Sequence, residues 1–472
     1  MPPLRRIDVV LDSVKRLQRI GATGNLLNLL QKQHPADLAE VLAELSDSER
    51  RTVFNTLLAH NSRLGMEALS ELDSEVAETL LVDHAPDELA RLFTELPTDD
   101  AAALVGHLPK ELSSAVLELM HSADSDDVQH LLEYEDQTAG RIMNPNVFAL
   151  QEDLTAGEAI MALQLHRDVE MVFYLYVVDE RRHLVGVVSL RRLLLVSPET
   201  PLERIMTAEL ISARVDTDQE DVAREVANYN LLAIPVVDEE NKLAGIITVD
   251  DVIDVIKDEA TEDILKLAGV AADEHVFTSP MEAWRKRLPW LGINLVTAIC
   301  AALVVREFQA TVEEVVALAA FMTGVASMGG NAATQTLTVI VRGIALGELT
   351  WSNSRRVLGK EALVGIGNGV VLGGAGALVA WWIVGNPYIG GILALAMFIN
   401  LLVAAIAATM IPIALRALKV DPALASSVFI TTLTDVFGFF AFLGLATFFL
   451  QYLQRVAGGD RLPAQNVHCS LK

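Results

Sequence analysis

Five long apolar segments in the C-terminal part of the chain restrict its fold more than any other feature. They span approximately 288–305, 315–346, 362–384, 389–415 and 424–450. A transmembrane α-helix needs about 20 predominantly apolar residues to cross the hydrocarbon core of a bilayer. We therefore expect an α-helical transmembrane bundle of five spans over 288–452, followed by a C-terminal tail over 453–472.

Basic residues near the span ends predict the orientation, because cytoplasmic loops carry an excess of Lys and Arg. Only Arg306 lies in the opposite loops. Nine basic residues lie before the first span or in the loops after the second and fourth spans: Arg285, Lys286, Arg287, Arg342, Arg355, Arg356, Lys360, Arg416 and Lys419. Residues 1–21 contain no apolar signal-peptide core. We expect a multi-pass protein of the cell membrane with a cytosolic N-terminus and an external C-terminus.

Charge is distributed unevenly between the two parts of the chain. Residues 288–472 hold 10 Lys and Arg and 8 Asp and Glu, a net charge of +2, so the total of −26 leaves −28 for residues 1–287. Such an acidic part repels phosphates, which excludes nucleic acid as a partner, and it attracts cations. Acidity that only keeps the domain soluble is the alternative. The two cysteines, Cys300 and Cys469, form neither a disulfide framework nor a zinc motif.

Asp435 is the one acidic residue that the sequence places well inside an apolar segment. A carboxylate at mid-membrane costs about 2.5–3.5 kcal/mol on insertion scales, and such residues are functional by default. Thr431 and Gly438 share its helix face. This face predicts a water-filled path with a cation ligand, and a protonated Asp435 that joins helices is the alternative.

A second polar stretch lies in the segment 315–346. Asn331 and Gln335 are four residues apart and share a helix face, while Gly329 and Gly330 permit a close backbone approach or carbonyl groups exposed at a break. Oxygen ligands of this kind suit a hard cation. Helix packing through small residues is the alternative. One Asp per chain gives few oxygens for Mg2+, which retains several waters, so we expect a homodimer with two copies of Asp435 around one axis.

The cytosolic part contains two kinds of repeat. Residues 24–133 contain related stretches such as 34–42 and 85–93, with N-cap signals and helical apolar spacing, and predict an all-α superhelical N domain. Residues 138–258 contain a duplication, since Val177-Val178-Asp179-Glu180 recurs 59 residues later as Val236-Val237-Asp238-Glu239. Each copy predicts strand, turn, strand and helix. This α/β pair resembles tandem CBS domains, at about 138–198 and 200–258, which often bind adenine nucleotides.

The densest group of acidic residues follows the second copy. Asp251, Asp254, Asp258 and Glu262 share one face of a predicted helix. Like charges at this spacing repel, and a divalent cation relieves the repulsion. The pattern therefore predicts a cation sensor, with a solvated acidic face as the alternative.

The order of these parts resembles the MgtE family of Mg2+ transporters over roughly 25–452. The stretches that carry the resemblance include Glu135–Gly140, Asp216–Glu220, Ala260–Asp263 and Val420–Leu424. It implies a homodimeric, Mg2+-selective, channel-like uptake protein that cytosolic Mg2+ closes. The implied pore ligands are Asp435, Thr431, Asn331 and Gly329. The implied cytosolic sensor comprises Asp218, Glu220, Asp251, Asp254, Glu259, Glu262, Asp263 and Asp421. A linker over 259–287 is expected to contain a plug helix at about 275–287.

The resemblance also implies a nucleotide site. At three positions the chain differs from what the family leads us to expect. Thr248 and Asp251 match the family's adenine-nucleotide position for ATP or a related ligand, whereas the first CBS copy has Arg192 where the family has Asp. Asn230 stands where an Asp is expected in the sensor, Ser427 where an Asn is expected near the pore entrance, and Thr431 where a smaller residue is usual. The preference for Mg2+ over Mn2+ or Co2+ therefore stays open.

Two other functions remain open at this point. The first is a secondary transporter that couples Mg2+, Mn2+ or Co2+ to a proton or Na+ gradient through Asp435. The second is a non-conducting membrane sensor that reports metal or nucleotide to a partner. The sequence contains no nucleophile–base set, His metal pair or phosphate-binding glycine loop, so we do not expect an enzyme.

Overall fold

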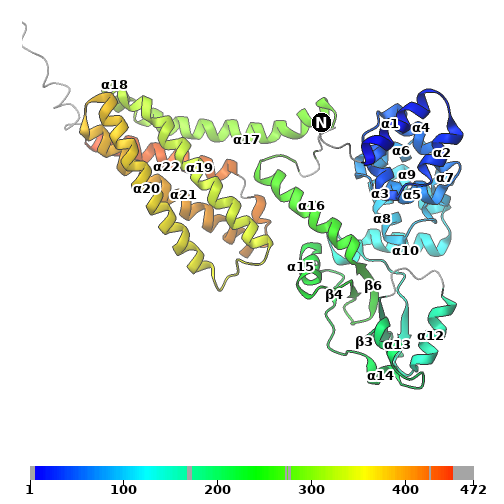
Figure 1. The fold of residues 1–472 in the computed structure, drawn as a ribbon. Coiled ribbons are helices and arrows are strands. Elements are labelled where there is room, and N and C mark those ends of the chain that lie inside the picture. The colour runs from blue at the N-terminus through cyan, green and yellow to red at the C-terminus, as the bar shows by residue number, and fades with distance from the viewer. Residues whose placement is uncertain (1–5, 167–172, 272–273, 275–277, 425–426, 450–472) are drawn as a thin grey trace, which may run out of the picture. The chain divides into compact units, whose positions relative to one another are not determined.

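The computed structural model describes residues 6–166, 173–271, 274, 278–424 and 427–449. The chain forms two compact units, 1–256 and 257–472. Figure 1 shows short helices in the first part of the chain, two small sheets after them and long helices in the C-terminal part.

The N domain consists of short helices joined by tight turns, as the sequence predicts. Pro35 and Pro86 start two of these helices at a position where the missing N–H is tolerated, and Ser46 with Glu49 forms a capping box on a third. The helices are α1 Arg6–Arg19, α2 Thr23–Leu30, α3 Pro35–Ala43, α4 Asp47–Leu58, α5 Ser62–Ser70, α6 Ser74–Leu81, α7 Pro86–Phe93, α8 Thr98–His107, α9 Lys110–Leu119 and α10 Ser122–Glu133.

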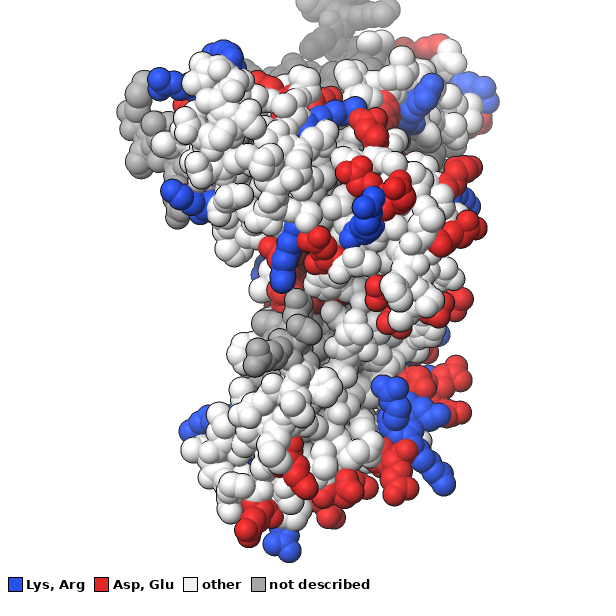
Figure 2. All heavy atoms as spheres, turned by 90° about the vertical axis from the view of Figure 1, so that its right-hand side faces the viewer, with Lys and Arg blue, Asp and Glu red and all other residues white. Residues whose placement is uncertain are grey.

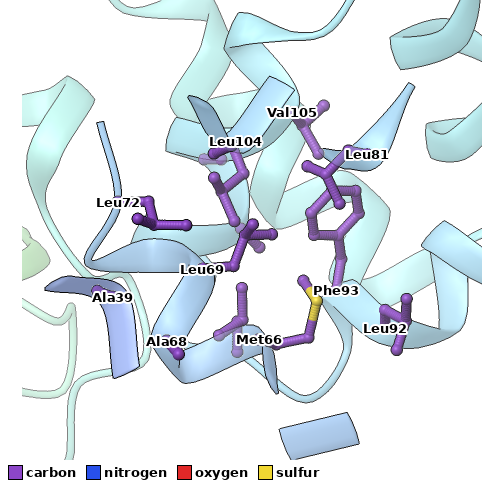
Figure 3. Close-up of a cluster of buried hydrophobic side chains, with 14 of the residues drawn as sticks. Ala39, Met66, Ala68, Leu69, Leu72, Leu81, Leu92, Phe93, Leu104 and Val105 are labelled. Carbon is purple, nitrogen blue, oxygen red and sulfur yellow. The ribbon is translucent and has the colours of Figure 1, made fainter. Parts of the chain in front are cut away.

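One apolar core joins these helices. Figure 3 shows Leu69 of α5, Leu81 of α6 and Phe93 of α7 pointing toward one another, and each is at most 1% exposed. Val14 of α1 is fully buried in the same core, so helical packing begins before the predicted boundary at residue 24. Much of the face drawn in Figure 2 is uncharged, and its Asp and Glu side chains lie mainly along the right-hand side and lower end, with Lys and Arg among them.

The two sheets repeat each other with the predicted offset of 59 residues. Tyr174 pairs with Ser189 in the first sheet and Ala233 with Thr248 in the second, and each central strand is parallel to the first strand and antiparallel to the third. The elements are α11 Ala139–Ile142, β1 Ala149–Gln151, α12 Ala156–Leu165, β2 Tyr174–Val178, β3 Leu184–Ser189, α13 Leu190–Leu195, α14 Leu202–Ile205, β4 Ala213–Arg214, α15 Gln219–Tyr229, β5 Ala233–Val237, β6 Leu243–Thr248 and α16 Val249–Leu267.

The C-terminal unit is a helical bundle. Its elements are α17 Pro280–Glu307, α18 Gln309–Glu314, α19 Ala317–Ala345, α20 Ser354–Val384, α21 Pro387–Ala417, η1 Pro422–Leu424 and α22 Ser427–Phe448. Helices α20 and α21 pack closely because Gly365, Gly369 and Gly373 follow one another every four residues. A Cβ atom on Gly373 would lie 2.8 Å from the carbonyl oxygen of Ala394.

Four helices in the described part of the chain are long and apolar enough to cross a membrane: α17, α20, α21 and α22. The expected second span is the helix α19, which has 29 residues. It falls short in hydropathy because Gly329, Gly330, Asn331, Thr334 and Gln335 interrupt its apolar sequence. The expected count of five spans is therefore not confirmed by length and composition.

The expected boundary between a plug helix and the first span does not appear as a break. Helix α17 begins at Pro280 and continues without interruption to Glu307, with Pro289 inside it. Residues 275–277 of the expected plug lie outside the described residues. Neighbouring groups in a membrane helix satisfy the backbone carbonyl that a proline leaves without a donor, so Pro289 need not end the helix.

The N-domain core predicts a clear difference between two leucines. Replacing the buried Leu69 with Ala should lower the free energy of unfolding by about 2–5 kcal/mol through lost burial and a residual cavity. The matched control is Leu119→Ala in α9, where the leucine is 56% exposed. This change should lower the free energy of unfolding by about 0.5 kcal/mol or less. Urea unfolding of a fragment of residues 1–267 measures both. Equal losses would contradict this assignment of the core.

Candidate functional site

The predicted pore face lies on α22, between two close helix contacts. Asp435 is half-buried, with Thr431 one turn before it and Gly438 one turn after it. A Cβ atom on Gly330 of α19 would lie 3.2 Å from Cγ2 of Thr431, and one on Gly438 would lie 2.7 Å from Nδ2 of Asn400. Within the described ranges, the Asp435 carboxylate has no hydrogen-bond or ion-pair partner in the chain. The carboxylate therefore lies beside a tightly packed helix junction.

The glycines of α19 serve close packing rather than a helix break. Helix α19 is continuous through Gly329 and Gly330, so the interpretation of carbonyls exposed at a break is wrong. Gly329 is buried and abuts the side-chain amide of Asn400, while Asn331 is exposed in the single chain. The structure thus brings Gly330 to Thr431, and it places Gly329 and Gly438 against one Asn side chain.

Sequence reasoning missed a second carboxylate in the bundle. Glu361 of α20 is 5% exposed, accepts a hydrogen bond from Thr336 Oγ1 at 3.2 Å and pairs with Lys360 at 2.9 Å. These groups line a cavity of about 210 Å3 together with Gln335 and Asn368. The sequence places Glu361 at the edge of a span, beside a basic residue. Its burial and its hydrogen bond with Thr336 of α19 are visible only in the folded bundle.

In the N-terminal unit, two carboxylates from distant parts of the sequence lie close together. Asp99 of α8 accepts hydrogen bonds from the Asp100 N–H at 3.1 Å and from Asn144 Nδ2 at 3.2 Å. Burial, with the nearby charges of Asp251 and Asp100, raises the pKa of Asp99 to about 8. Burial also raises the pKa of Asp251, against the opposing effect of its hydrogen bond from Thr248. The structure therefore adds Asp99 to the predicted acidic residues.

The structure also gathers acidic residues around Lys266. The Lys266 ammonium lies 2.6 Å from Asp421 Oδ2 and pairs with Glu262 one helical turn away. Burial raises the pKa of Asp263 to about 6, helped by Asp421 and opposed by Lys266. Burial lowers the pKa of Lys266, but its hydrogen bonds to Asp421 and Glu262 outweigh that effect and raise it. Glu262, Asp263 and Asp421 are thus brought together around a cation of the chain itself.

Among the other predicted sensor residues, Asp254 and Glu259 lie near residues already described. The charge of Asp254 contributes to the raised pKa of Asp251, and that of Glu259 to the raised pKa of Asp263. Asp218 caps α15 by accepting a hydrogen bond from the Glu220 N–H at 2.8 Å, and Glu220 pairs with Arg224 at 3.2 Å. Asp254 is exposed on α16, and Glu259 is half-buried. In the described part of the chain, no three His, Cys, Asp or Glu side chains converge closely enough to hold a metal ion. Within the described residues of each unit, the predicted sensor residues therefore form no closed set of metal ligands.

Local geometry accounts for one departure from the family pattern. Asn230 is the C-cap of α15 in the left-handed conformation, with φ 52° and ψ 46°. Asn adopts this conformation readily, which gives the residue a structural role there. Ser427 is the first residue of α22, and its side chain lies outside the described residues.

The predicted nucleotide residues contact each other. Thr248 Oγ1 donates to Asp251 Oδ2 at 2.5 Å, and the Thr248 N–H donates to the same oxygen at 3.2 Å. The same Asp251 carboxylate is electrostatically coupled to Asp99. Arg192 lies on α13 of the first copy, where its N–H donates to Ser189 Oγ at 3.3 Å. Asp251 is therefore a shared candidate for the nucleotide and cation sites.

Comparisons with known proteins cover nearly the whole chain. Family profiles match residues 33–137 as MgtE intracellular N domain, 139–199 and 202–258 as CBS domain, and 322–445 as divalent cation transporter. The magnesium transporter MgtE of Bacillus subtilis is 34% identical over 438 residues, 93% of this chain and 96% of that protein. This chain belongs to the MgtE family. The magnesium transporter MgtE of Thermus thermophilus is 35% identical over 445 residues, 93% of this chain and 98% of that protein.

Family membership confirms several sequence predictions. The chain has the N domain, the CBS pair and a helical membrane region of this family, and its MgtE relatives are transporters rather than enzymes. A solved structure of the cytosolic domain of the Mg2+ channel MgtE in complex with ATP is 36% identical. The alignment covers 52% of this chain and 99% of the chain in that structure, with a TM-score of 0.49.

The raised pKa of Asp99 predicts how stability depends on pH. Since the pKa of Asp99 is about 8 in the folded state and about 3.8 in the unfolded state, rising pH should destabilise the N-terminal unit between these values. Asp99→Asn mimics the protonated form. Without divalent cations it should raise the melting temperature at pH 8 by about 2–4 °C, equivalent to ~1 kcal/mol, and change it little at pH 4.

The matched control for this prediction is Asp124→Asn. It removes one charge from an exposed side chain of α10. Calorimetry of fragment 1–267 in a chelator between pH 4 and pH 9 measures both variants. Parallel pH profiles of the two variants would contradict the assignment to Asp99.

Proposed function

We propose that two copies of this chain form a Mg2+-selective pathway for uptake across the cell membrane, with Asp435 as the cation-binding group. One observation carries the proposal: a carboxylate without a partner among the described residues lies on α22, between the contacts at Gly330 and Gly438. A membrane bundle holds such a charge only when a cation, water or a proton satisfies it. Its MgtE relatives are magnesium transporters, which favours the cation.

The proposed pathway needs α19 as a fifth membrane-crossing helix. Helix α19 has 29 residues, and at 1.5 Å per residue it is longer than the roughly 30 Å hydrocarbon core. Polar residues such as Asn331 and Thr334 are tolerated where a helix faces protein or a water-filled path. With five spans, basic loops on the inside place the N-terminus in the cytosol and the C-terminus outside.

A homodimer follows from the number of oxygen ligands. One Asp435 per chain offers too few oxygens for Mg2+, even though the ion retains several waters. A two-fold axis beside α22 supplies a second carboxylate and a second Thr431. Two-fold symmetry is also the commonest arrangement of oligomers.

High cytosolic Mg2+ closes the pathway in this proposal. The carboxylates of Asp99 and Asp251 repel each other. Those of Glu262, Asp263 and Asp421 also repel one another, and the charge of Lys266 offsets part of that repulsion. A divalent cation favours the arrangement that brings these groups closest, so it shifts the population toward one conformation. Asp254 and Glu259 add to these repulsions, since their charges act on Asp251 and Asp263. Asp218 and Glu220 at the start of α15 are the further carboxylates of this proposed sensor. The Thr248–Asp251 contact supports a nucleotide that modulates the same region.

Replacing Asp435 tests the pathway directly. Mg2+ uptake into proteoliposomes with low internal Mg2+ should fall to background in Asp435→Asn, because the amide has the same shape but cannot neutralise a cation. Glu348→Gln, which removes an exposed carboxylate between α19 and α20, should transport like the unmodified protein. Equal uptake by Asp435→Asn would remove Asp435 from the pathway. No uptake by any form would favour a membrane sensor.

Replacing Lys266 tests the closing mechanism. In Lys266→Met the acidic residues lose the ammonium that neutralises them, so they should bind Mg2+ more tightly. Internal Mg2+ should then inhibit uptake at a concentration lower by about fivefold or more. Lys242→Met, which removes an exposed ion pair in a turn of the CBS pair, is the control. An unchanged inhibitory concentration in Lys266→Met would exclude this cluster from the closing mechanism.

A second candidate function is ion-coupled transport, which the buried Glu361 favours. A carboxylate between α19 and α20 beside a polar cavity is a candidate proton or Na+ site. Uptake that follows an imposed pH or Na+ gradient, and that loses this dependence in Glu361→Gln, would support coupling. Uptake independent of both gradients would support the channel.

A further inference from the structure

The packing around Asp435 contains a buried polar side chain that the pore assignment does not use. Asn400 of α21 is 1% exposed, and its Nδ2 donates to the backbone oxygen of Val325 in α19 at 2.9 Å. Its Oδ1 is buried and has no hydrogen-bond partner among the described residues. A buried amide oxygen of this kind costs free energy, so its presence needs a compensating function.

Two glycines on two different helices make room for this side chain. A Cβ atom on Gly438 of α22 would lie 2.7 Å from Asn400 Nδ2, and one on Gly329 of α19 would overlap the same amide. These glycines are therefore the positions where α19 and α22 both close onto α21. Gly444, two turns farther along α22, differs, because its nearest neighbour would be Phe308 at 3.9 Å.

The Asn400 contact lies one helical turn from the pore carboxylate. Asp435 and Gly438 are three residues apart and share a face of α22. The other contact on this face, between Thr431 and Gly330, lies one turn before Asp435. Contacts on both sides of Asp435 thus fix its position relative to α19. Asn400 makes the contact nearer the C-terminal end of α22.

We propose that Asn400 is a positioning residue for transport. Its side chain lies between Gly329 and Gly438 as a wedge, by which we mean a spacer that sets the place of Asp435 in the ion pathway. The proposal rests on the proposed function of Asp435. The hydrogen bond to Val325 fixes the rotamer of the wedge. The two glycines let both helices rest on the flat amide. A shift of α22 alters the distance between carboxylate and hydrated ion, and ions that differ in hydration respond differently.

A double-mutant cycle tests the wedge in full-length protein reconstituted into liposomes. Gly438→Ala should lower the Mg2+ uptake rate by about tenfold or more, because the added methyl group displaces α22 or Asn400. Asn400→Ala should lower the rate less and change the ratio of Mg2+ to Co2+ uptake by about threefold or more. Adding Asn400→Ala to Gly438→Ala should restore the rate to that of Asn400→Ala alone. The control Gly444→Ala should leave rate and ratio unchanged.

Two further variants separate positioning from folding and from the proposed function. Asn400→Ser keeps a hydroxyl donor for Val325 and should restore the Mg2+ to Co2+ ratio, a readout that does not depend on the amount of folded protein. Additive losses in the cycle, or an unchanged ratio in Asn400→Ala, would overturn the wedge. Asp435→Asn is measured alongside. If it transports normally, the pore assignment fails; if it is inactive while the cycle is additive, only the wedge fails.

Discussion

The cost of placing a carboxylate among apolar helices underlies the account of this protein. Insertion scales put the cost of a carboxylate at mid-membrane at about 2.5–3.5 kcal/mol, and the Asp435 carboxylate has no partner in the described part of the chain. Glu361 offers a contrast, because it is buried more deeply but is paired with Lys360 and hydrogen-bonded to Thr336. One acid is thus satisfied within the chain. The other has no partner among the described residues, which is why we propose it as the cation-binding group.

The same electrostatic cost recurs among the acidic residues around Asp99 and around Lys266. Asp99 and Asp251 come together although burial and like charge raise both pKa values. The ammonium of Lys266 partly neutralises the acidic residues around it, since it pairs with Glu262 and Asp421. In the proposed closing mechanism a divalent cation relieves each of these repulsions, and the acidity of the N-terminal part serves to sense the transported ion. In this proposal, transport and control both depend on one interaction, that of carboxylate oxygens with a hard cation.

Patterns local in sequence predicted the parts of the molecule well. The repeat of 59 residues is visible in the sequence, and it reappears in the paired registers of Tyr174–Ser189 and Ala233–Thr248. Contacts between distant segments could not be predicted in this way. Asp99 meets Asp251 only through tertiary packing, Lys266 and Asp421 are 155 residues apart, and the role of Asn400 depends on glycines of two other helices. The expected span 362–384 begins one residue after Glu361, so the sequence analysis did not consider this carboxylate.

The most direct test of the central claim is the reversal potential of the current through reconstituted protein in a planar bilayer, with unequal Mg2+ on the two sides. If the carboxylate of Asp435 serves a Mg2+ pathway, the reversal potential follows the Mg2+ gradient with the slope of a divalent ion. It also stays unchanged when the pH or Na+ gradient is altered. A reversal potential that follows either of those gradients, or the absence of any current at low cytosolic Mg2+, would contradict the account.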